Sequence, residues 1–260
     1  MKGSLPENNF VLLETNRFDK DNSRSYLFTN PTRIISCYNP EKLKEKLSRL
    51  DGWLSKGYYA AGFISYEAGY IFEEGLKKYM DLNPLYPLMW FGIYKDPIIF
   101  DHKDKIDVFT RGDSLYSVNN LRANVSQKEY IHNINRIKNF IRQGNTYQVN
   151  YTFKYKFDFS GSLYSFYQDL KEKQSVSYSA LIKTQDHSIL SLSPELFFKK
   201  NRKKIEVRPM KGTFNRGRDL AHDRLNMSAL RDSLKDRSEN VMIVDLLRND
   251  LGRICKPGTV

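Results

Sequence analysis

The chain has 260 residues and a formal net charge of +12, with 40% hydrophobic and 13% aromatic residues. This composition is typical of a globular protein with a sizeable core and excludes a disordered chain. No apolar run approaches the roughly 18 residues of a membrane-spanning helix, and Met1–Glu14 lacks the pattern of a secretory signal. Cys37 and Cys255 are too far apart for a disulfide framework or a metal motif, so we expect a cytoplasmic protein with no membrane contact.

The excess of basic residues favours an anionic partner. Its densest cluster, residues 199–204, lies between two apolar runs, a pattern that predicts a solvated hairpin tip. Because no nucleic-acid-binding module is present, we expect no nucleic-acid partner. A small dianionic substrate would be served equally well by this charge.

In the first half of the chain, residues 9–15 and 25–38 have the pattern of short strands. Asn39-Pro40 then predicts a helix start, with Asn as the N-cap and Pro at the first helical position. Four leucines give this helix its buried face and Gly57 its stop, namely Leu43, Leu47, Leu50 and Leu54. Residues 58–70 predict a buried strand, and residues 88–100 a strand pair or one long strand.

A second helix is predicted from the capping box formed by Ser126 and Glu129 to a stop at Gly144. Its apolar residues recur at helical spacing: Tyr130, Ile134, Ile137 and Ile141. The period then changes to two over residues 147–157, which indicates a half-buried strand whose polar face carries Gln148, Asn150 and Thr152.

The remaining chain predicts a helix over 164–173, three strands, an irregular segment and two helices. The strands are expected at 178–183, 188–192 and 195–207 with a turn near Asn201, the irregular segment at 208–213, and the helices at 219–234 and 238–251. Because short turns join most strands, we expect an α+β fold with mostly antiparallel sheets.

Lys211 is the first candidate for chemistry, because it lies between Pro209-Met210 and Gly212 directly after a predicted strand. Pro fixes one backbone angle and Gly permits close approach of a ligand, so the lysine could face a cleft and act as a nucleophile when neutral. The alternative is a surface lysine in a turn.

Glu195 and Glu239 are the candidate carboxylates. Glu195 precedes the apolar residues 196–198, where a carboxylate could act as a general acid, or it could simply point outward at the start of a strand. Glu239 begins an apolar stripe on the last helix and suits a metal, but Asp236 and Glu239 also fit the start of a helix, where Glu239 would cap a backbone N–H. Pairing of Asp245 with Arg248 is expected in the same helix.

These residues occur in segments that resemble the family of chorismate-binding enzymes. The segments are GNTYQVNYT (144–152), SLSPELFF (191–198), RPMKGT (208–213) with Arg216-Gly217, and SENVMIVDLLRNDLGRI (238–254). Upstream, SYLFTNPTRII (25–35) and AGFISYEAGYIFE (61–73) resemble the aminodeoxychorismate synthases of this family in particular. The resemblance implies two facing, mostly antiparallel sheets flanked by helices, an N-terminal region over 1–115 and the first part of the chorismate-binding domain over 116–260.

The resemblance also implies site roles. Lys211 stands at the covalent nucleophile, where anthranilate synthases have alanine, Glu195 at the general acid and Glu239 at a Mg²⁺ ligand. Gly212 and Thr213 stand in the substrate site with Gln148, which occupies the place of a water-activating lysine in relatives. The implied partners are chorismate and a glutamine amidotransferase subunit that supplies ammonia.

Two departures from the family pattern affect these expectations. Leu12-Leu13-Glu14-Thr15 is similar to an LLES motif that lines a tryptophan pocket in relatives. Thr15 replaces the serine of that motif and Ser177 replaces a proline usual in the facing segment, so a role in a core strand is at least as good an interpretation. Family members also continue beyond the segment that ends at Val260, so the fold is expected to be incomplete at the C-terminus and this chain alone inactive. The alternatives are an anthranilate synthase, a non-catalytic partner-binding module, or nucleic-acid binding through charge alone.

Overall fold

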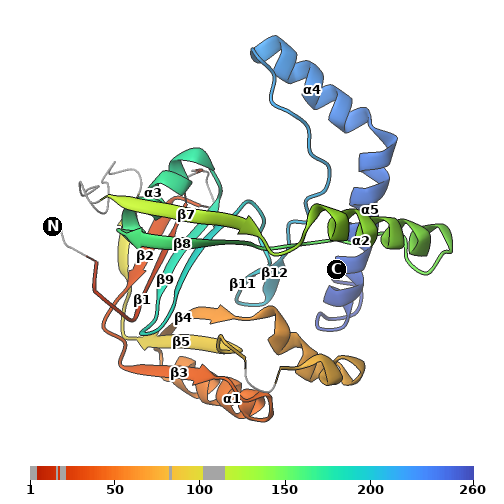
Figure 1. The fold of residues 1–260 in the computed structure, drawn as a ribbon. Helices are drawn as coiled ribbons and strands as arrows, with labels where there is room; N and C mark the ends of the chain where they lie inside the picture. Colours follow the sequence, from red (N-terminus) through yellow and green to blue (C-terminus); the bar gives the residue numbers. More distant parts are fainter. Residues whose placement is uncertain (1–4, 16, 18–21, 82–83, 102–114) are drawn as a thin grey trace. The chain divides into compact units, whose positions relative to one another are not determined.

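The computed structural model describes residues 5–15, 17, 22–81, 84–101 and 115–260 (Figure 1). These residues form two compact units: one contains β7, α2, β8 and α3, and the other contains the remaining elements. The predicted division between 1–115 and 116–260 falls beside residues 102–114, which lie outside the described residues, so it stays a prediction. The N-terminal segment Met1–Glu14 is expected to lack a secretory signal, and its residues 1–4 also lie outside the described residues.

The larger unit is built on two antiparallel sheets. One has five strands in the order β10-β9-β1-β2-β6, and the other has three in the order β3-β5-β4. Their bounds are β1 Phe10–Glu14, β2 Arg24–Phe28, β3 Arg33–Cys37, β4 Tyr59–Ile64, β5 Met89–Tyr94, β6 Ile98–Asp101, β9 Tyr178–Lys183 and β10 Ser188–Ser193. The central strand β1 pairs Leu12 with Leu27 on one side and with Leu181 on the other. The expected α+β fold with facing antiparallel sheets is therefore confirmed.

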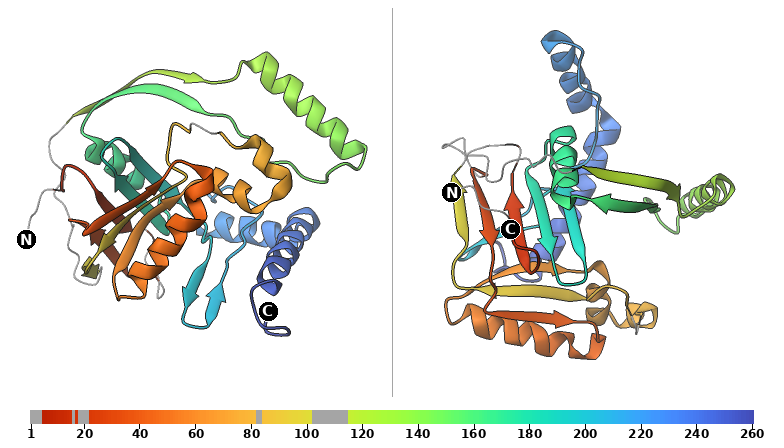
Figure 2. Two further views of the ribbon diagram at one scale, coloured as in Figure 1. Left: turned by 90° about the horizontal axis from the view of Figure 1, so that it is seen from below. Right: turned by 60° about the vertical axis from the view of Figure 1, so that its left-hand side comes forward.

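Side chains from both sheets meet in one buried cluster. It consists of Val11, Phe28 and Ile182 from the five-stranded sheet with Ala61, Trp90 and Tyr94 from the three-stranded sheet. The strands of the two sheets run in different directions across this cluster (Figure 2). A β-carbon on Gly92 would lie 2.1 Å from the hydroxyl oxygen of Tyr94, so the ring can pack here only because residue 92 has no side chain. Burial also raises the pKa of Tyr94.

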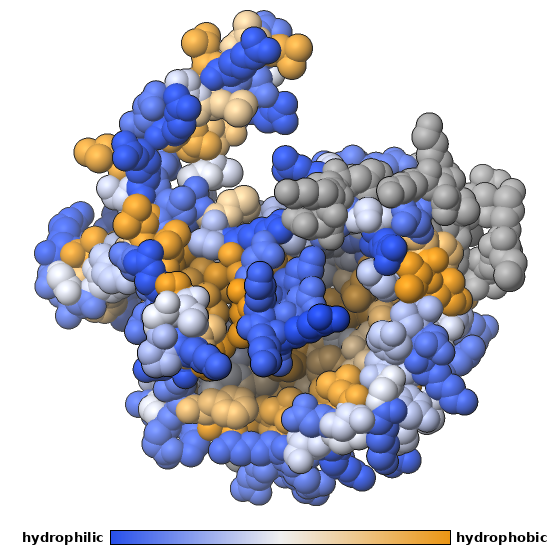
Figure 3. Space-filling view, turned by 180° about the vertical axis from the view of Figure 1, so that it is seen from behind, coloured by the Kyte–Doolittle hydropathy of each residue, from blue (hydrophilic) through white to orange (hydrophobic). Residues whose placement is uncertain are grey.

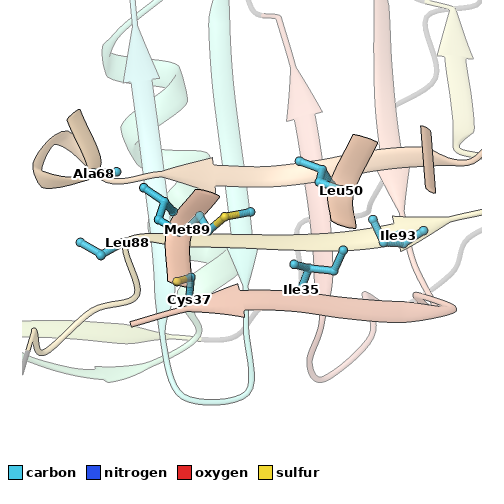
Figure 4. Packing of buried hydrophobic residues seen from close by; sticks show 8 residues of the cluster. Ile35, Cys37, Leu50, Ala68, Leu88, Met89 and Ile93 are labelled. Atoms are coloured by element: carbon cyan, nitrogen blue, oxygen red, sulfur yellow. The ribbon is translucent and has the colours of Figure 1, made fainter. Parts of the chain in front are cut away.

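Helix α1 covers the other face of the three-stranded sheet. A short 3₁₀ turn, η1 (Pro40–Lys42), leads into α1 (Leu43–Leu54), and the side chain of Asn39 accepts a 2.8 Å hydrogen bond from the Glu41 N–H, as the sequence predicts. The buried cluster beneath the helix consists of Ile35, Cys37, Leu43, Leu50, Ala68, Leu88, Met89 and Ile93 (Figure 4). The prediction that Leu54 belongs to the buried face of this helix was wrong. Leu54 lies in the last turn of the helix, and its side chain is 44% exposed.

The aromatic run at 58–70 is only partly a strand. β4 ends at Ile64, and the chain continues as the 3₁₀ helices η2 (Tyr66–Phe72) and η3 (Glu74–Tyr79). Tertiary packing decides this ending, because the first turn of η2 buries Ala68 in the cluster under α1. The predicted strand pair at 88–100 is confirmed, although β5 and β6 belong to different sheets.

The smaller unit contains β7 (Tyr116–Ala123), α2 (Gln127–Arg142), β8 (Tyr155–Gly161) and α3 (Leu163–Lys173). Ser126 and Glu129 form the predicted capping box, and Gly144 follows α2 with φ +73. The strand predicted over 147–157 was wrong for most of its length, because only its last residues belong to β8. Residues 147–154 instead follow α2, where the ring of Tyr130 lies 5.6 Å from that of Tyr151.

The C-terminal part of the larger unit has a hairpin followed by two helices. β11 (Lys199–Asn201) and β12 (Lys204–Glu206) form the expected solvated hairpin, with its turn at Arg202 in the left-handed region at φ +52. The helices are α4 (Leu220–Asp232) and α5 (Leu234–Gly252). None of the helices in the described residues is long and apolar enough to span a bilayer.

Large hydrophobic side chains are exposed on both of these helices, including Leu220, Leu225, Met227, Leu234, Val241 and Leu246. In Figure 3, patches of hydrophobic residues lie between hydrophilic residues on the face of the molecule that is seen from behind.

Substitution of Ile93, which is 0% exposed beneath α1, tests where the core lies. We expect Ile93→Ala to lower the free energy of unfolding by about 2–5 kcal/mol, because it removes buried methyl groups and leaves a cavity. The matched control is Ile98→Ala in β6, where the side chain is 50% exposed and the expected loss is within about 1 kcal/mol. Urea denaturation measures both, and equal losses would contradict the assignment of the core.

Candidate functional site

The carboxylate of Glu195 lies beside the segment that carries Lys211. Glu195 follows β10 in a turn in which its backbone N–H donates to Ser193 Oγ at 3.3 Å. Its own Oε1 accepts a hydrogen bond of 3.2 Å from the backbone N–H of Met210. Glu195 is exposed, so the structure does not place it in the apolar surroundings that its sequence neighbours suggest.

Gly212 fixes the path of the chain on the other side of Lys211. It has φ +81, a region that favours glycine, and a β-carbon there would lie 3.2 Å from Cβ and Oδ1 of Asp236 and from Leu230. The segment 210–212 therefore lies between the Glu195 turn and the first turn of α5. Lys211 itself is half-buried, so its side chain is partly shielded from solvent.

Helix α5 carries both Asp236, which lies beside this segment, and Glu239. The helix is capped by Ser233, whose Oγ accepts from the N–H of Asp236 at 3.3 Å. The sequence-based start at 238 was therefore too late, and the interpretation of Glu239 as a helix cap was wrong. Asp236 and Glu239 are three residues apart, which places them on neighbouring positions of the helix surface. Glu239 thus lies one turn beyond the residue that packs against Gly212.

A carboxylate holds the turn that follows Lys211. Asp223 accepts hydrogen bonds of 2.8 Å from Arg216 Nε and from the Gly217 N–H, and a second Asp223 oxygen lies 2.7 Å from an Arg216 terminal nitrogen. These bonds keep the pKa of Asp223 below its ordinary value, with the Arg216 hydrogen bond as the largest cause. The turn is tight, since a β-carbon on Gly217 would lie 2.1 Å from the backbone nitrogen of Asp223.

The other predicted residues have less specific surroundings. Gln148 is half-buried in the smaller unit, where its carbonyl accepts a 3.1 Å hydrogen bond from Thr146, and Thr213 is exposed. Asp245 and Arg248 form the expected pair at 2.7 Å near the end of α5. The described part of the chain contains no group of three or more His, Cys, Asp or Glu residues arranged to hold a metal ion.

A cavity of about 410 Å³ adjoins the segments that flank Glu195 and Lys211. Its lining combines cationic, aromatic and small polar side chains: Asn22, Ser23, Arg24, Tyr26, Tyr178, Leu196, Phe198, Lys199 and Arg208. Arg24 lies 3.5 Å from Asp101, and Arg208 forms an ion pair with Glu206. Three cations beside aromatic rings suit an organic anion.

A second cavity, of about 280 Å³, shows what the Leu12–Thr15 segment does. Leu12 is buried in the core, as the core-strand interpretation expects, and Leu13, Glu14 and Thr15 line the cavity. Ser177 and Ser179 also line this cavity, and Ser179 pairs with Glu14 in the neighbouring strand.

Two site residues were missed by sequence reasoning. Asp236 packs against Gly212, and Asp223 holds the Arg216-Gly217 turn, yet neither was singled out for these contacts. Asp236 could have been found from the spacing of Ser233 and Asp236, which is typical of a helix start. Nothing local marks Asp223, because its partners lie six and seven residues earlier across a turn.

The sequence of this chain is similar to those of several known proteins. A family model described as chorismate binding enzyme matches residues 10–260. The chain is 33% identical over 219 residues to the aminodeoxychorismate synthase component 1 of Klebsiella aerogenes, covering 77% of this chain and 48% of that protein. It is 31% identical over 244 residues to the anthranilate synthase component 1 of Saccharolobus solfataricus, covering 89% and 56%. The chain therefore spans about half the length of the curated relatives that it matches.

Solved structures support the same fold. The crystal structure of anthranilate synthase component I from Streptococcus pneumoniae matches with a TM-score of 0.67 at 18% identity, covering 97% of this chain and 63% of that one. A putative 2,3-dihydroxybenzoate-specific isochorismate synthase from Bacillus anthracis matches with a TM-score of 0.57 at 12% identity, covering 90% and 57%. At these identities the likeness shows the fold alone.

The tight packing around Gly212 predicts that adding one methyl group at this position destabilises the protein. We expect Gly212→Ala to destabilise the protein by about 1–2 kcal/mol, because φ is positive there and the new β-carbon meets Asp236. The control is Gly52→Ala in α1, where nothing lies within 4 Å and alanine should stabilise the helix by about 0.5–1 kcal/mol. Thermal unfolding measures both, and effects of the same sign would contradict this geometry.

The Asp223 turn predicts a titration in acid. Because the folded-state pKa of Asp223 is lowered, its ionised form stabilises the turn at neutral pH. This contribution is lost as pH falls below the ordinary value near 3.9 and through the lowered pKa. We expect the NMR shift of the Gly217 amide to titrate with a midpoint below 3.9, and Arg216→Gln to raise that midpoint. A wild-type midpoint at or above 3.9 would contradict the hydrogen bonds described.

Proposed function

Because this chain belongs to the family of chorismate binding enzymes, we propose that it is part of an aminodeoxychorismate synthase component I. Such an enzyme converts chorismate and ammonia to 4-amino-4-deoxychorismate, the precursor for p-aminobenzoate and folate synthesis. Curated relatives with this name, at 31% to 33% identity over 77% of the chain, support the proposal. The single observation that carries it is Lys211, held half-buried between the Glu195 turn and α5.

In the proposed reaction, Lys211 is the nucleophile. Its neutral amine attacks C2 of chorismate and loses a proton, the two conjugated double bonds of the ring shift, and the C4 hydroxyl leaves. Ammonia then attacks C4, the two double bonds shift back, the bond from C2 to the lysine breaks, and a proton passes from the new amino group to the lysine nitrogen. The product carries an amino group at C4, and the lysine is regenerated.

Glu195 is the proposed general acid for the first step. A protonated carboxyl group would give its proton to the C4 oxygen, so that water leaves rather than hydroxide. Support for this role comes from the hydrogen bond that joins Glu195 to the backbone beside Lys211, because an acid and a nucleophile must reach the same substrate ring. The cationic cavity beside them would favour a dianion such as chorismate.

Glu239 is the proposed protein ligand for Mg²⁺. A single carboxylate fits this ion, because Mg²⁺ is usually held by one or two carboxylates together with waters and substrate oxygens. When bound, the ion would supply positive charge that neutralises a carboxylate of the substrate. The backbone at Gly212, the hydroxyl of Thr213 and the amide of Gln148 are proposed to contact chorismate. Glutamine cannot act as a base, which argues against direct addition of water.

The proposed ammonia source is a glutamine amidotransferase subunit in the cytoplasm. The relatives named component 1 support a second component, since the name implies a partner. The other candidate function is that of an anthranilate synthase component I, which the relative from Saccharolobus solfataricus favours. Lys211 argues against this second candidate, because the family resemblance implies alanine at that position in anthranilate synthases.

Trapping of the covalent intermediate tests the proposal. Without ammonia, incubation with chorismate and Mg²⁺ should give an adduct on Lys211 with the mass of chorismate less one water, because the second attack cannot occur. Intact-protein mass spectrometry followed by peptide mapping detects it. The adduct should be absent from Lys211→Ala and present in Lys204→Ala, whose lysine lies on the exposed hairpin.

Two results would count against the proposal. Formation of anthranilate from chorismate and ammonia would favour the second candidate. Binding of chorismate with Mg²⁺ but without an adduct would show that the nucleophile is not used. Failure to bind chorismate would mean that this chain does not form the whole site, and the proposed roles would then be tested in the same variants of a longer chain.

A further inference from the structure

A small groove lies between α1 and the edge strand β3, apart from every residue of the candidate site. Its volume is about 180 Å³, and it is lined by Arg33, Ile34, Ile35, Lys46, Arg49 and Trp53. Lys46, Arg49 and Trp53 are three and four residues apart, so they share one face of α1. α1 runs alongside β3 in Figure 1, and β3 is an outer strand of the three-stranded sheet. The groove therefore joins one helix face to the start of one strand.

Three cationic side chains converge on this small volume with little compensation. Arg49 lies 3.7 Å from Glu45, but both side chains are more than half exposed, at 55% and 61%, so this pair is weak. Among the residues that the structure describes, Arg33 and Lys46 have no ion-pair partner within 4.0 Å. Like charges brought together repel one another, and an anion in the groove would relieve that repulsion.

The groove also has a fixed apolar wall. The ring of Trp53 packs edge-on against Tyr58 at 4.9 Å, with the ammonium of Lys56 5.2 Å from its centre. Trp53 and Tyr58 both pack against the cluster beneath α1, and Ile35 in that cluster is only 6% exposed. An aromatic ring held in this way can contact the planar or apolar part of a ligand at little entropic cost.

We propose that this groove binds a small organic phosphate monoester. The phosphate would lie among Arg33, Lys46 and Arg49, and its organic part would lie against Trp53. Arginine matches phosphate oxygens with paired hydrogen bonds, and a monoester carries nearly two negative charges at neutral pH. The volume is below the roughly 300 Å³ at which pockets for drug-sized ligands begin, so the ligand is a small molecule rather than a nucleic acid. This site is independent of the proposed function.

Tryptophan fluorescence tests the proposal on the full chain, with phenyl phosphate as the probe at constant ionic strength. The chain has two tryptophans. Trp90 is 5% exposed in the core, so the signal should come from Trp53 and be lost in Trp53→Phe. We expect saturable quenching that inorganic phosphate competes away.

Charge variants identify the residues that bind. Arg33→Gln and Lys46→Gln should each weaken binding about tenfold, the effect of losing one charge-assisted hydrogen bond. The control, Lys44→Gln, removes the same charge from an exposed position of α1 that does not line the groove, and it should leave binding unchanged. Circular dichroism confirms that each variant is folded, and Arg49→Gln replaces any variant that is not.

Three outcomes would overturn the proposal. Equal weakening by Lys44→Gln would show diffuse attraction to a basic helix. Tighter binding of phthalate than of phenyl phosphate would assign the groove to dicarboxylates. Absence of saturation by both phosphate probes at millimolar concentration would show that the groove is a solvated basic surface.

Discussion

The packing of two antiparallel sheets against each other is the constraint on which the larger unit depends. Trp90 and Tyr94 from β5 meet Val11 and Ile182 from the five-stranded sheet, and this contact buries apolar surface from strands far apart in the sequence. β9 lies next to β1 in that sheet, and β10 lies next to β9. β10 ends at Ser193, two residues before Glu195. The position of the candidate acid is thus set by a core that contains no site residue.

Backbone contacts, more than side-chain networks, bring the candidate site together. Glu195 bonds to the amide of Met210, and Gly212 leaves room for Asp236 at the start of α5. Lys211 lies between these two contacts. An irregular segment can therefore hold a lysine in place, because the residues on both sides of the lysine are each held by a contact. Asp223 then closes the following turn through Arg216 and Gly217.

The basic side chains have different surroundings on different surfaces of this protein. On the β11–β12 hairpin it is solvated, and in the cavity beside Glu195 it is partly balanced by Asp101 and Glu206. In the groove between α1 and β3, by contrast, Arg33 and Lys46 converge without an acidic partner among the described residues. The net charge alone does not distinguish these cases, because what matters is which cations share a cavity and with which carboxylates.

The sequence by itself determined the resemblance to the family, the α+β class and the helix starts at Asn39 and Ser126, and it singled out Lys211, Glu195 and Glu239 as candidates, because these depend on local spacing and on recognisable segments. Tertiary structure decided the rest. The alternation at 147–157 became strand only where β7 supplies a partner, and the aromatic run at 58–70 turned into 3₁₀ helix where Ala68 enters the core. Strand pairing and burial each depend on what the chain meets in space, which no local pattern encodes.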